Sequence, residues 1–336
     1  MKQHFLKRLV LMMMPVSLIF AVIFGNAVAA GGTGTELADV VRQHGQLQVV
    51  GSQLCDARGV PIQLKGVSSH GLQWFPFSKN TLKNFISDWH ISVVRAAMYT
   101  VEGGYIGNES QMKQRVKELV DQAIEDGIYV IIDWHILSDN DPNIHKTEAQ
   151  SFFAEMARTY GNYPNVIYEI CNEPNQVTWN RAIKPYAEYV IPAIRAVDPD
   201  NIIIVGTDTW SQGVDAPADN PLNFKQIMYA LHFYAGTHTK WLRDRADAAL
   251  AKGIALFVTE WGTTQASGSG GVYRDEAQRW IDWMADQKIS WCNWSVSNKS
   301  EDSAIFKPRV SLDGPWRDSD LTESGLWVKS KILSEH

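Results

Sequence analysis

The chain has 336 residues, 45% of them hydrophobic, which is enough for one large domain with a sizeable buried core. Its formal net charge is −6, from 37 acidic and 31 basic residues, and nothing suggests the basic face that a nucleic-acid-binding protein uses. Thirteen tryptophans are many, and an exposed indole can stack on a sugar ring as well as fill a core.

The first thirty residues have the pattern of a signal peptide. Basic residues within 2–8 precede an apolar run at 9–24, and the small residues of 27–29 suit a signal peptidase. The apolar run is shorter than the about 20 residues that a helix needs to cross a bilayer. We therefore expect secretion, to the outside or to a periplasm, with cleavage near Ala29 or Ala30 and no membrane contact afterwards. An uncleaved anchor is the alternative.

Three cysteines, Cys55, Cys171 and Cys292, are an odd number for an exported chain and too few for a disulfide framework. Cys171 and Cys292 each end an apolar run, so we expect them to be small buried hydrophobic residues.

Beyond the signal segment and a short lead, the chain opens with strand-like pieces at 47–50 and 62–64. They flank a turn signal at 56–59, and together they predict a short N-terminal β-hairpin. Short apolar runs and helical patterns then alternate to the end of the chain.

The predicted strands are Leu64–Val67, Val93–Ala97, Tyr129–Asp133, Val166–Glu169, Ile202–Gly206, Met228–His232, Leu256–Glu260 and Ser290–Trp294. The predicted helices are Leu82–Trp89, Gln111–Asp126, Glu148–Tyr160, Ile183–Val197, Lys240–Lys252, Arg274–Gln287 and Leu326–Leu333, with at most a weak helix at Pro217–Gln226.

Eight strands alternating with helices indicate a parallel sheet that is buried on both faces. Eight is also the number that closes a (β/α)8 TIM barrel, which typically takes about 250 residues. A doubly wound open sheet is the alternative architecture. No low-complexity linker divides the chain, so residues 31–336 are predicted to form a single domain.

Polar and aromatic residues follow the predicted strands at the carboxyl ends, where a barrel builds its active face. In chain order they are Ser69-His70, Arg95, Asp133-Trp134-His135, Asn172-Glu173-Pro174, Trp210, His232-Phe233-Tyr234, Glu260-Trp261-Gly262 and Trp294.

Two glutamates stand out among these residues. Glu173 and Glu260 end the fourth and seventh strands, which lie nearly opposite each other in a ring of eight. Hydrolysis of a glycoside needs one carboxylic acid to protonate the leaving oxygen and a second carboxylate to attack or to activate water. Either glutamate alone is explained by a salt bridge, whereas the pair favours a glycosidase.

Arg95, His135, His232 and Tyr234 would ring the same mouth. A guanidinium is a fixed fork of donors that keeps a neighbouring carboxylate ionised. A zinc site built from histidines and Asp133 is the alternative. The sequence has no His-x-His or His-Glu-x-x-His spacing, so we expect neither a metal nor another cofactor.

Trp74, Trp210 and Trp294 follow or end strands on the same face. Core packing explains each of them alone, but beside paired carboxylates they suit a cleft that stacks on sugar rings.

Seven segments together resemble glycoside hydrolase family 5, particularly its bacterial endoglucanase subfamily. They are Ser69–Phe75, Val94–Tyr99, Asp133–His135, Tyr168–Pro174, His232–His238, Val258–Gly262 and Trp291–Ser295. The resemblance covers the chain after the signal segment. It implies an endo-β-1,4-glucanase that hydrolyses internal bonds of cellulose-like chains with retention.

The resemblance also implies roles for individual residues. Glu173 would be the acid/base and Glu260 the nucleophile, while Asn172 would bind a sugar 2-hydroxyl. Arg95, with His232 and Tyr234, would orient Glu260. His135 would line the same subsite and Trp294 would be its floor, with Trp74 and Trp210 as platforms on the two sides of the scissile bond. Further polar contacts to sugars would come from His70, Tyr99, Lys299 and Glu301.

Two cysteines depart from the family pattern: Cys171 stands where many relatives have alanine, and Cys292 where an aliphatic residue is common. No carbohydrate-binding module is expected beside the catalytic domain, so efficient attack on crystalline cellulose is in doubt. The expected partner is a β-1,4-glucan polysaccharide, either cellulose or a soluble cellulose derivative, and the expected state is a monomer.

Three alternatives stay open at this point. The same barrel could serve a β-mannanase, a xyloglucanase or another β-glucanase. A non-catalytic glycan-binding protein on a decayed barrel is disfavoured because both glutamates are present. A metal-dependent amidohydrolase is the third.

Overall fold

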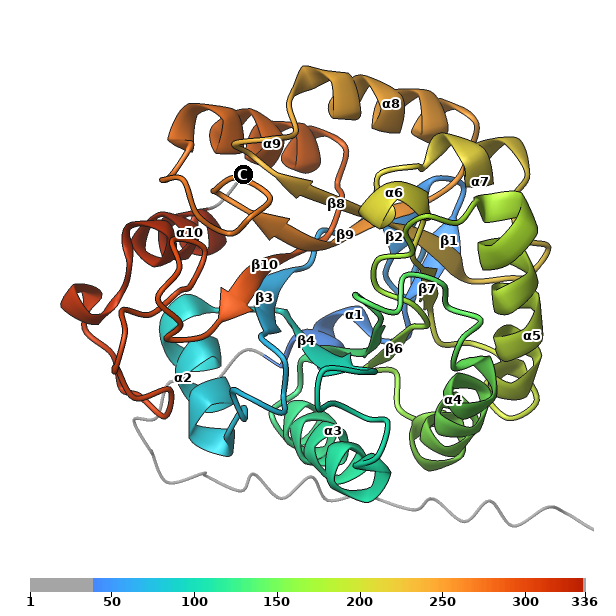
Figure 1. Cartoon of the computed structure of the whole chain (residues 1–336), viewed down its shortest axis with the longest axis horizontal. Helices are drawn as coiled ribbons and strands as arrows, with labels where there is room; N and C mark the ends of the chain where they lie inside the picture. Colours follow the sequence, from blue (N-terminus) through green and yellow to red (C-terminus); the bar gives the residue numbers. More distant parts are fainter. Residues whose placement is uncertain (1–38, 335–336) are drawn as a thin grey trace, which may run out of the picture. The chain divides into compact units, whose positions relative to one another are not determined.

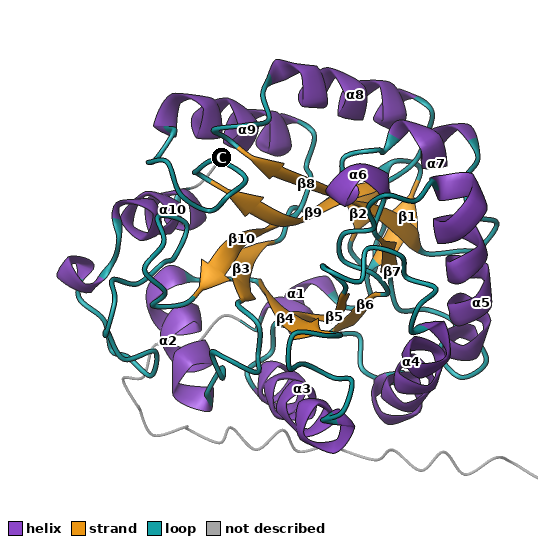
Figure 2. Cartoon of the chain, in the orientation of Figure 1, coloured by secondary structure: helices purple, strands orange, loops and turns teal. Residues whose placement is uncertain are grey.

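The computed structural model describes residues 39–334, and the predicted signal peptide lies outside them. Within this range eight parallel strands close into a barrel in the order β10-β3-β4-β5-β6-β7-β8-β9, with the helices around it (Figures 1 and 2). The (β/α)8 barrel is therefore confirmed over the doubly wound sheet.

The barrel strands are β3 (Lys65–Ser69), β4 (Val93–Tyr99), β5 (Tyr129–His135), β6 (Val166–Glu169), β7 (Ile203–Val205), β8 (Ile227–Tyr234), β9 (Leu256–Gly262) and β10 (Trp291–Val296). The helices are α1 (Val40–His44), α2 (Lys79–Trp89), α3 (Glu109–Glu125), α4 (Lys146–Tyr160), η1 (Trp179–Ile183), α5 (Lys184–Arg195), α6 (Asp208–Ser211), α7 (Asp215–Asp219), α8 (Lys240–Ala251), α9 (Arg274–Asp286), η2 (Asp318–Asp320) and α10 (Glu323–Leu333).

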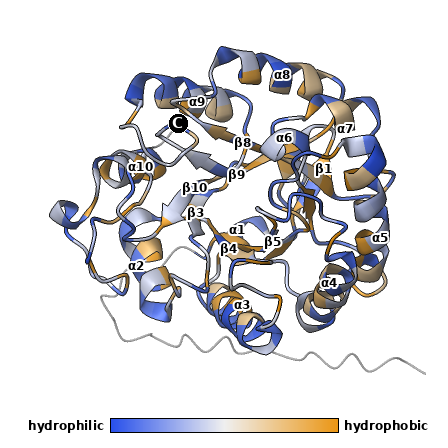
Figure 3. Cartoon of the chain, in the orientation of Figure 1, coloured by the Kyte–Doolittle hydropathy of each residue, from blue (hydrophilic) through white to orange (hydrophobic). Residues whose placement is uncertain are grey.

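The strands have hydrophobic residues on both faces because both faces are covered. Every residue of β4 and β5 is buried. Side chains such as Tyr129, Ile131 and Phe257 fill the lower interior of the barrel. Figure 3 shows β4 and β5 as hydrophobic, while β3 and β10 are paler. The paler strands contain serine and asparagine, and they lie beside the polar side chains of the barrel mouth.

The outer helices form because their apolar residues recur at helical spacing. In α2 the residues Leu82, Phe85, Ile86 and Trp89 are buried against the sheet. Burying each such side chain stabilises the fold by about 1.5–3 kcal/mol. The Ser78 hydroxyl accepts a hydrogen bond from Thr81 N and caps the first turn.

The N-terminal hairpin exists, but its second strand was predicted wrongly. β1 (Gln48–Val50) pairs with β2 (Gln53–Cys55), not with 62–64. The cause is a tight turn at Gly51, whose φ of +61° glycine adopts easily, so the chain reverses immediately after β1. The predicted turn around Asp56 does form, and it follows β2.

Every barrel strand lies within two residues of its predicted boundaries, and the seven predicted helices are present. After β7 the structure has the short α6 and α7, earlier than the weak helix considered at 217–226. The three cysteines are free and buried, as expected for Cys171 and Cys292. No helix among residues 39–334 is long and apolar enough to span a bilayer.

Candidate active site

A cleft of about 780 Å³ lies at the carboxyl ends of the barrel strands. Twelve of the fourteen predicted site residues line it: His70, Trp74, Tyr99, His135, Glu173, Trp210, His232, Tyr234, Glu260, Trp294, Lys299 and Glu301. The other two, Arg95 and Asn172, are fully buried beside it. The predicted residues therefore come together at one site.

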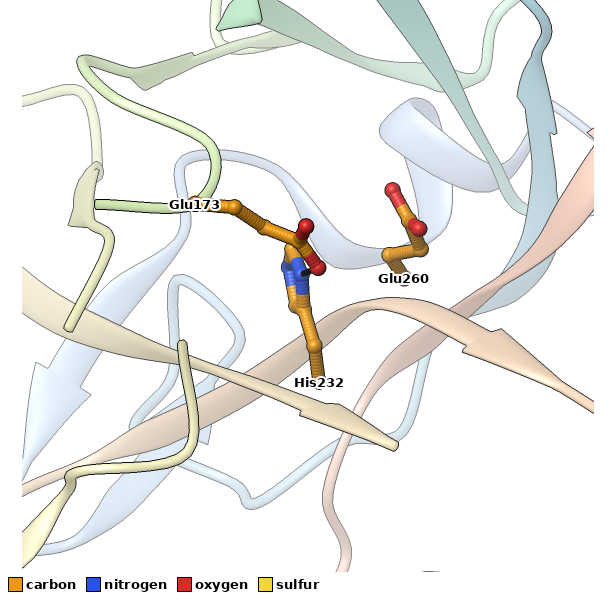
Figure 4. A group of neighbouring side chains, drawn as sticks. All are labelled: Glu173, His232 and Glu260. Atoms are coloured by element: carbon orange, nitrogen blue, oxygen red, sulfur yellow. Dashed lines mark hydrogen bonds and ion pairs between the residues drawn. The ribbon is translucent and has the colours of Figure 1, made fainter. Parts of the chain in front are cut away.

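The two glutamates face each other across this cleft. Glu173 follows β6, and Glu260 lies within β9. A carboxylate oxygen of each and a ring nitrogen of His232 all lie within 4.8 Å of one another. Figure 4 shows the Glu173 carboxylate beside the His232 ring, with Glu260 to one side of the pair. This separation is too short for a water molecule to be activated between the carboxylates.

Arg95 on β4 holds the Glu260 carboxylate from below. Its Nη1 donates to Glu260 Oε2 at 3.1 Å, and its Nε donates to Glu169 Oε2 at 2.7 Å. Its Nη2 lies 3.0 Å from Asp133 Oδ2. Burial opposes the charge on Arg95, but these three carboxylates raise its pKa well above the ordinary value. Arg95 is therefore a permanent cation. Burial nevertheless raises the pKa of Asp133 well above its ordinary value, against the charge of Arg95.

Tyr234 at the end of β8 binds the other oxygen of Glu260. Its hydroxyl donates to Oε1 at 2.7 Å. Burial and the nearby Glu260 raise the pKa of Tyr234 well above its usual range, so the phenol stays protonated. Each oxygen of Glu260 thus has its own donor, and the carboxylate is held in a fixed orientation.

His232 connects Glu173 to the buried Glu169 through Thr259. The Thr259 hydroxyl donates to Glu169 Oε1 at 2.6 Å, so its oxygen accepts from His232 Nε2 at 2.8 Å. His232 Nδ1 faces Glu173 Oε1 at 2.9 Å. Burial raises the pKa of Glu169, but the charges of Arg95 and His232 and the hydrogen bonds to them together outweigh it and lower this pKa to about 2. Since Nε2 always carries a hydrogen, Nδ1 and Glu173 share the one proton that can move.

Asn172 orients its neighbours instead of facing the cleft. Its Oδ1 accepts from Arg95 Nη2 at 2.6 Å, so its Nδ2 donates to His135 Nε2 at 3.2 Å and to Ile136 O at 3.0 Å. His135 Nδ1 then donates to Asp133 Oδ2 at 2.6 Å. Burial lowers the pKa of His135 to about 3, so the ring is neutral. The expected contact of Asn172 with a sugar 2-hydroxyl stays a prediction.

Stacked rings form one wall of the cleft. Trp294 packs on His135, with ring centres 5.3 Å apart and planes 15° apart, and it contacts His70 at 4.9 Å. Trp74 meets His70 and Tyr99 edge-on at 5.7 and 5.0 Å. Trp294 is buried apart from its cleft face, while Trp74 is exposed. The two indoles therefore form a floor and a rim on the same side.

Trp210 stands on the opposite side, on a strained turn. Thr209, Trp210 and Ser211 all have φ between 53° and 58°, a left-handed conformation that costs residues with a Cβ roughly 1 kcal/mol or more each. Ser211 Oγ donates to Asn172 O at 2.7 Å, and Trp210 N donates to Pro174 O at 3.1 Å. These bonds fasten the turn to the loop that carries Glu173.

Sequence reasoning missed the positioning roles of Glu169 and Thr259. An acidic residue inside the apolar run of β6 was the available signal, because a buried carboxylate needs a charged partner. The lining residues not predicted are Glu102, Leu137, Gln212, Thr237, His238, Trp241, Ala266, Ser267 and Gly268. They come from loops and from the start of α8.

Glu173, His232 and Glu260 form the one group among residues 39–334 that could hold a metal ion by proximity. Its donor atoms already have protein partners. His232 Nε2 is bonded to Thr259, and both Glu260 oxygens are bonded to Arg95 and Tyr234. A cation here would displace those bonds and lie next to the fixed charge of Arg95, so the residues do not fit a metal centre.

The family model described as cellulase (glycosyl hydrolase family 5) matches residues 55–300. The chain belongs to glycosyl hydrolase family 5. An endoglucanase from Clostridium saccharobutylicum is 59% identical over 320 residues, which cover 94% of this chain and 70% of that protein. Endoglucanase A from Evansella cellulosilytica is 58% identical over 82% of this chain. This chain spans only 57% of the length of the latter.

Solved structures of family 5 proteins agree with this assignment. The catalytic domain of Thermobifida fusca endoglucanase Cel5A is 42% identical, with a TM-score of 0.85 over 88% of this chain and 99% of that one. A structure named cellulase Cel5C_n is 48% identical, also with a TM-score of 0.85.

Proposed function

We propose that this family 5 protein is an endo-β-1,4-glucanase that hydrolyses internal bonds of β-1,4-glucan with retention of the β-configuration. The observation that carries the proposal is the facing pair of carboxylates within 4.8 Å, inside a cleft rimmed by exposed indoles. The named endoglucanase relatives support the substrate, as does a form of the Thermobifida fusca enzyme in complex with cellotetraose.

In the first step Glu260 attacks the anomeric carbon and a glycosyl-enzyme forms. Arg95 and Tyr234 hold the two Glu260 oxygens, so the lone pair that attacks is aimed before the sugar arrives. The bond to the leaving sugar breaks as Glu173 gives its proton to the departing oxygen. The short distance between the two carboxylates favours this covalent route over direct displacement by water.

In the second step Glu173 takes a proton from water, and the resulting hydroxide displaces Glu260 from the anomeric carbon. In the first step the one proton shared by His232 Nδ1 and Glu173 goes to the leaving oxygen. The proton that Glu173 takes from water in the second step replaces it and restores the starting state of the pair. Glu173 therefore acts first as acid and then as base.

Cleavage inside a chain requires room for sugars on both sides of the broken bond. The cleft has Trp74 at one side and Trp210 at the other, both exposed, with the glutamates between their strands. An indole face suits the flat C–H surface of a pyranose, and an open groove admits a polymer without needing its end.

The test uses purified protein on soluble carboxymethyl-cellulose, with viscosity and reducing ends followed together. We expect viscosity to fall quickly while few new ends appear, and Glu260→Ala to show neither change. A folded wild-type sample that alters neither quantity would contradict the proposal. Galactomannan, xyloglucan and mixed-linkage glucan measured alongside would then identify the substrate that the cleft accepts.

We further propose that the protein is exported, on the basis of the basic start and apolar run before Ala29. Expression of the full chain in a bacterium, followed by N-terminal sequencing of the protein recovered outside the cytoplasm, tests this. The expected new N-terminus lies at Ala30 or Gly31, and an intact N-terminus would contradict export with cleavage.

A further inference from the structure

Three tryptophans of the described chain are more than two-fifths exposed, and all three line the cleft. Trp74 is 47% exposed, while Trp210 and Trp241 are each 45% exposed. Trp74 and Trp210 were expected as sugar platforms, but Trp241 was predicted only as part of a helix. Covering an exposed indole lowers the free energy, and a single exposed apolar residue is common. Three indoles that open into one cleft form a group, and such a group indicates a ligand that binds there.

Trp241 is the second residue of α8, and the structure fixes its ring from two directions. The Arg245 guanidinium lies over the ring at 5.6 Å, and the His238 ring meets it edge-on at 6.0 Å. Arg245 is not among the cleft-lining residues, whereas Trp241 and His238 are. The guanidinium therefore covers one face of the indole, while Trp241 still lines the cleft and stays 45% exposed.

The same arginine places Trp241 on the Trp210 side of the cleft. Arg245 Nη1 donates to Gln212 O at 3.4 Å, two residues after Trp210, and Arg245 Nε lies 3.4 Å from Asp215 Oδ1. Trp74, by contrast, contacts His70 and Tyr99 on the opposite wall. The aromatic residues of the cleft thus run from Trp74, past Glu173 and Glu260, to Trp210 and Trp241.

Polar groups accompany the indole, as a sugar site requires. Gln212 and Thr237 line the cleft here. His238 Nδ1 accepts a hydrogen bond from Tyr234 N at 2.8 Å, and burial lowers the pKa of His238 to about 4. The neutral ring therefore carries its hydrogen on Nε2, where it can donate to a hydroxyl group.

We propose that Trp241 is a further sugar platform, beyond Trp210, that binds the outer glucosyl units of long β-1,4-glucan chains. The proposal rests on the proposed function and adds a dependence on chain length to it. Short oligosaccharides occupy the centre of the cleft and do not reach Trp241. Longer ones do, and the added stacking draws them towards the Trp210 side before cleavage.

The experiment compares Trp241→Ala with wild type on cellotetraose and on cellohexaose labelled at the reducing end. We expect KM for cellohexaose to rise about five- to tenfold, with kcat nearly unchanged, because stacking is the same in ground and transition states. Cellotetraose kinetics should stay within about twofold. The cellohexaose bond that is cut most often should also change, because the oligosaccharide is bound less tightly on the Trp210 side of the cleft.

Two further variants separate stacking from folding. Trp241→Phe keeps an aromatic face and should recover most of the cellohexaose affinity and the original cutting pattern. Tyr189→Ala is the matched control, because Tyr189 is also an exposed helical aromatic with a cation, Lys146, over its ring, but it lies outside the cleft. It should leave both substrates unaffected.

Equal changes in KM for the two oligosaccharides, or an unchanged cutting pattern in Trp241→Ala, would overturn the platform role while leaving the glucanase function intact. A wild-type enzyme that leaves both oligosaccharides uncut would instead overturn the proposed function, and the subsite with it.

Discussion

Arg95 lies wholly buried between Asp133, Glu169 and Glu260. A buried guanidinium is stable only when its charge is matched and its donors are used. The sequence places it on a strand that is otherwise apolar, and the fold brings the three carboxylates to it from β5, β6 and β9. Arg95 thereby fixes the orientation of Glu260. It also favours the ionised form of Glu169, which is linked to His232 through Thr259.

The chain of hydrogen bonds from Glu169 through Thr259 and His232 to Glu173 gives a prediction for Glu169→Gln. The amide keeps the shape of the side chain but removes the negative charge that helps raise the pKa of His232. The proton shared by His232 and Glu173 is then lost at lower pH. We expect the alkaline limb of the kcat/KM profile to move to lower pH, because that limb reports the coupled pair.

A pH–rate profile on a soluble oligosaccharide measures this shift. Glu155→Gln is the control, since Glu155 is a partly exposed carboxylate paired with Lys113 and Lys117 on the outer helices. An alkaline limb that stays in place in Glu169→Gln, in a folded protein, would show that Glu169 does not act on the pair.

A site residue could be predicted from the sequence where it stands at the end of a predicted strand. Glu173, Glu260 and His232 follow apolar runs, so their convergence could be foreseen from the barrel alone. Thr259 and Glu169 could not be assigned roles, because which residues of a strand point inward depends on register. Trp241 was hidden by its helix, in which a large apolar residue is ordinarily core.

The position of Trp210 in the cleft is set by the α6 turn and its hydrogen bonds to the loop that carries Glu173. The left-handed α6 turn stores strain, and the Ser211 hydroxyl holds it against the Glu173 loop by bonding Asn172 O and Thr207 N. Gly206 permits this closeness: a methyl group there would lie 2.3 Å from Cys171 O.

Two variants of Ser211 test the turn. Ser211→Ala loses both hydrogen bonds and keeps a Cβ at φ +58°, so we expect unfolding to become easier by about 2 kcal/mol and KM to rise more than kcat falls. Ser211→Gly loses the same bonds but tolerates the backbone, and it should be the less destabilised of the two. Denaturant melts and oligosaccharide kinetics measure both effects. Equal stability of the two variants would contradict the strain.

The order of elements was predicted well because apolar strand runs and amphipathic helices differ clearly in period. The hairpin was predicted wrongly because the strong turn signal around Asp56 masked the two-residue turn at Gly51. The α6 turn left no sequence signal, since three consecutive left-handed residues without glycine depend in part on tertiary bonds, from Ser211 to Asn172 O and from Trp210 N to Pro174 O.

The whole molecule should be most stable near neutral pH, because buried histidines act in opposite directions. Burial lowers the pKa of His70 and of His238 to about 4, below the unfolded value of about 6.5. Their contribution is present above pH 6.5 and is lost as pH falls towards 4. Burial also opposes the charge on His232, but bonds to Glu169 and Glu173 raise its pKa to about 9. Its contribution is complete below pH 6.5 and is lost as pH rises towards 9.

Chemical denaturation at a series of pH values tests this balance. We expect the free energy of unfolding to decline on both sides of neutrality, with His232→Asn flattening the alkaline side and His238→Asn the acid side. Wild-type stability that keeps rising between pH 7 and pH 9 would rule out a charged, partnered His232.

The central claim is that Glu260 and Glu173 hydrolyse a β-linked glucan by double displacement. Proton NMR of the first product formed from a cello-oligosaccharide tests it most directly, because the anomeric signals are read before mutarotation mixes them. The account predicts that the β-anomer appears first. An initial α-anomer would show single displacement by water, and would contradict both the nucleophile assignment and the meaning given to the close carboxylates.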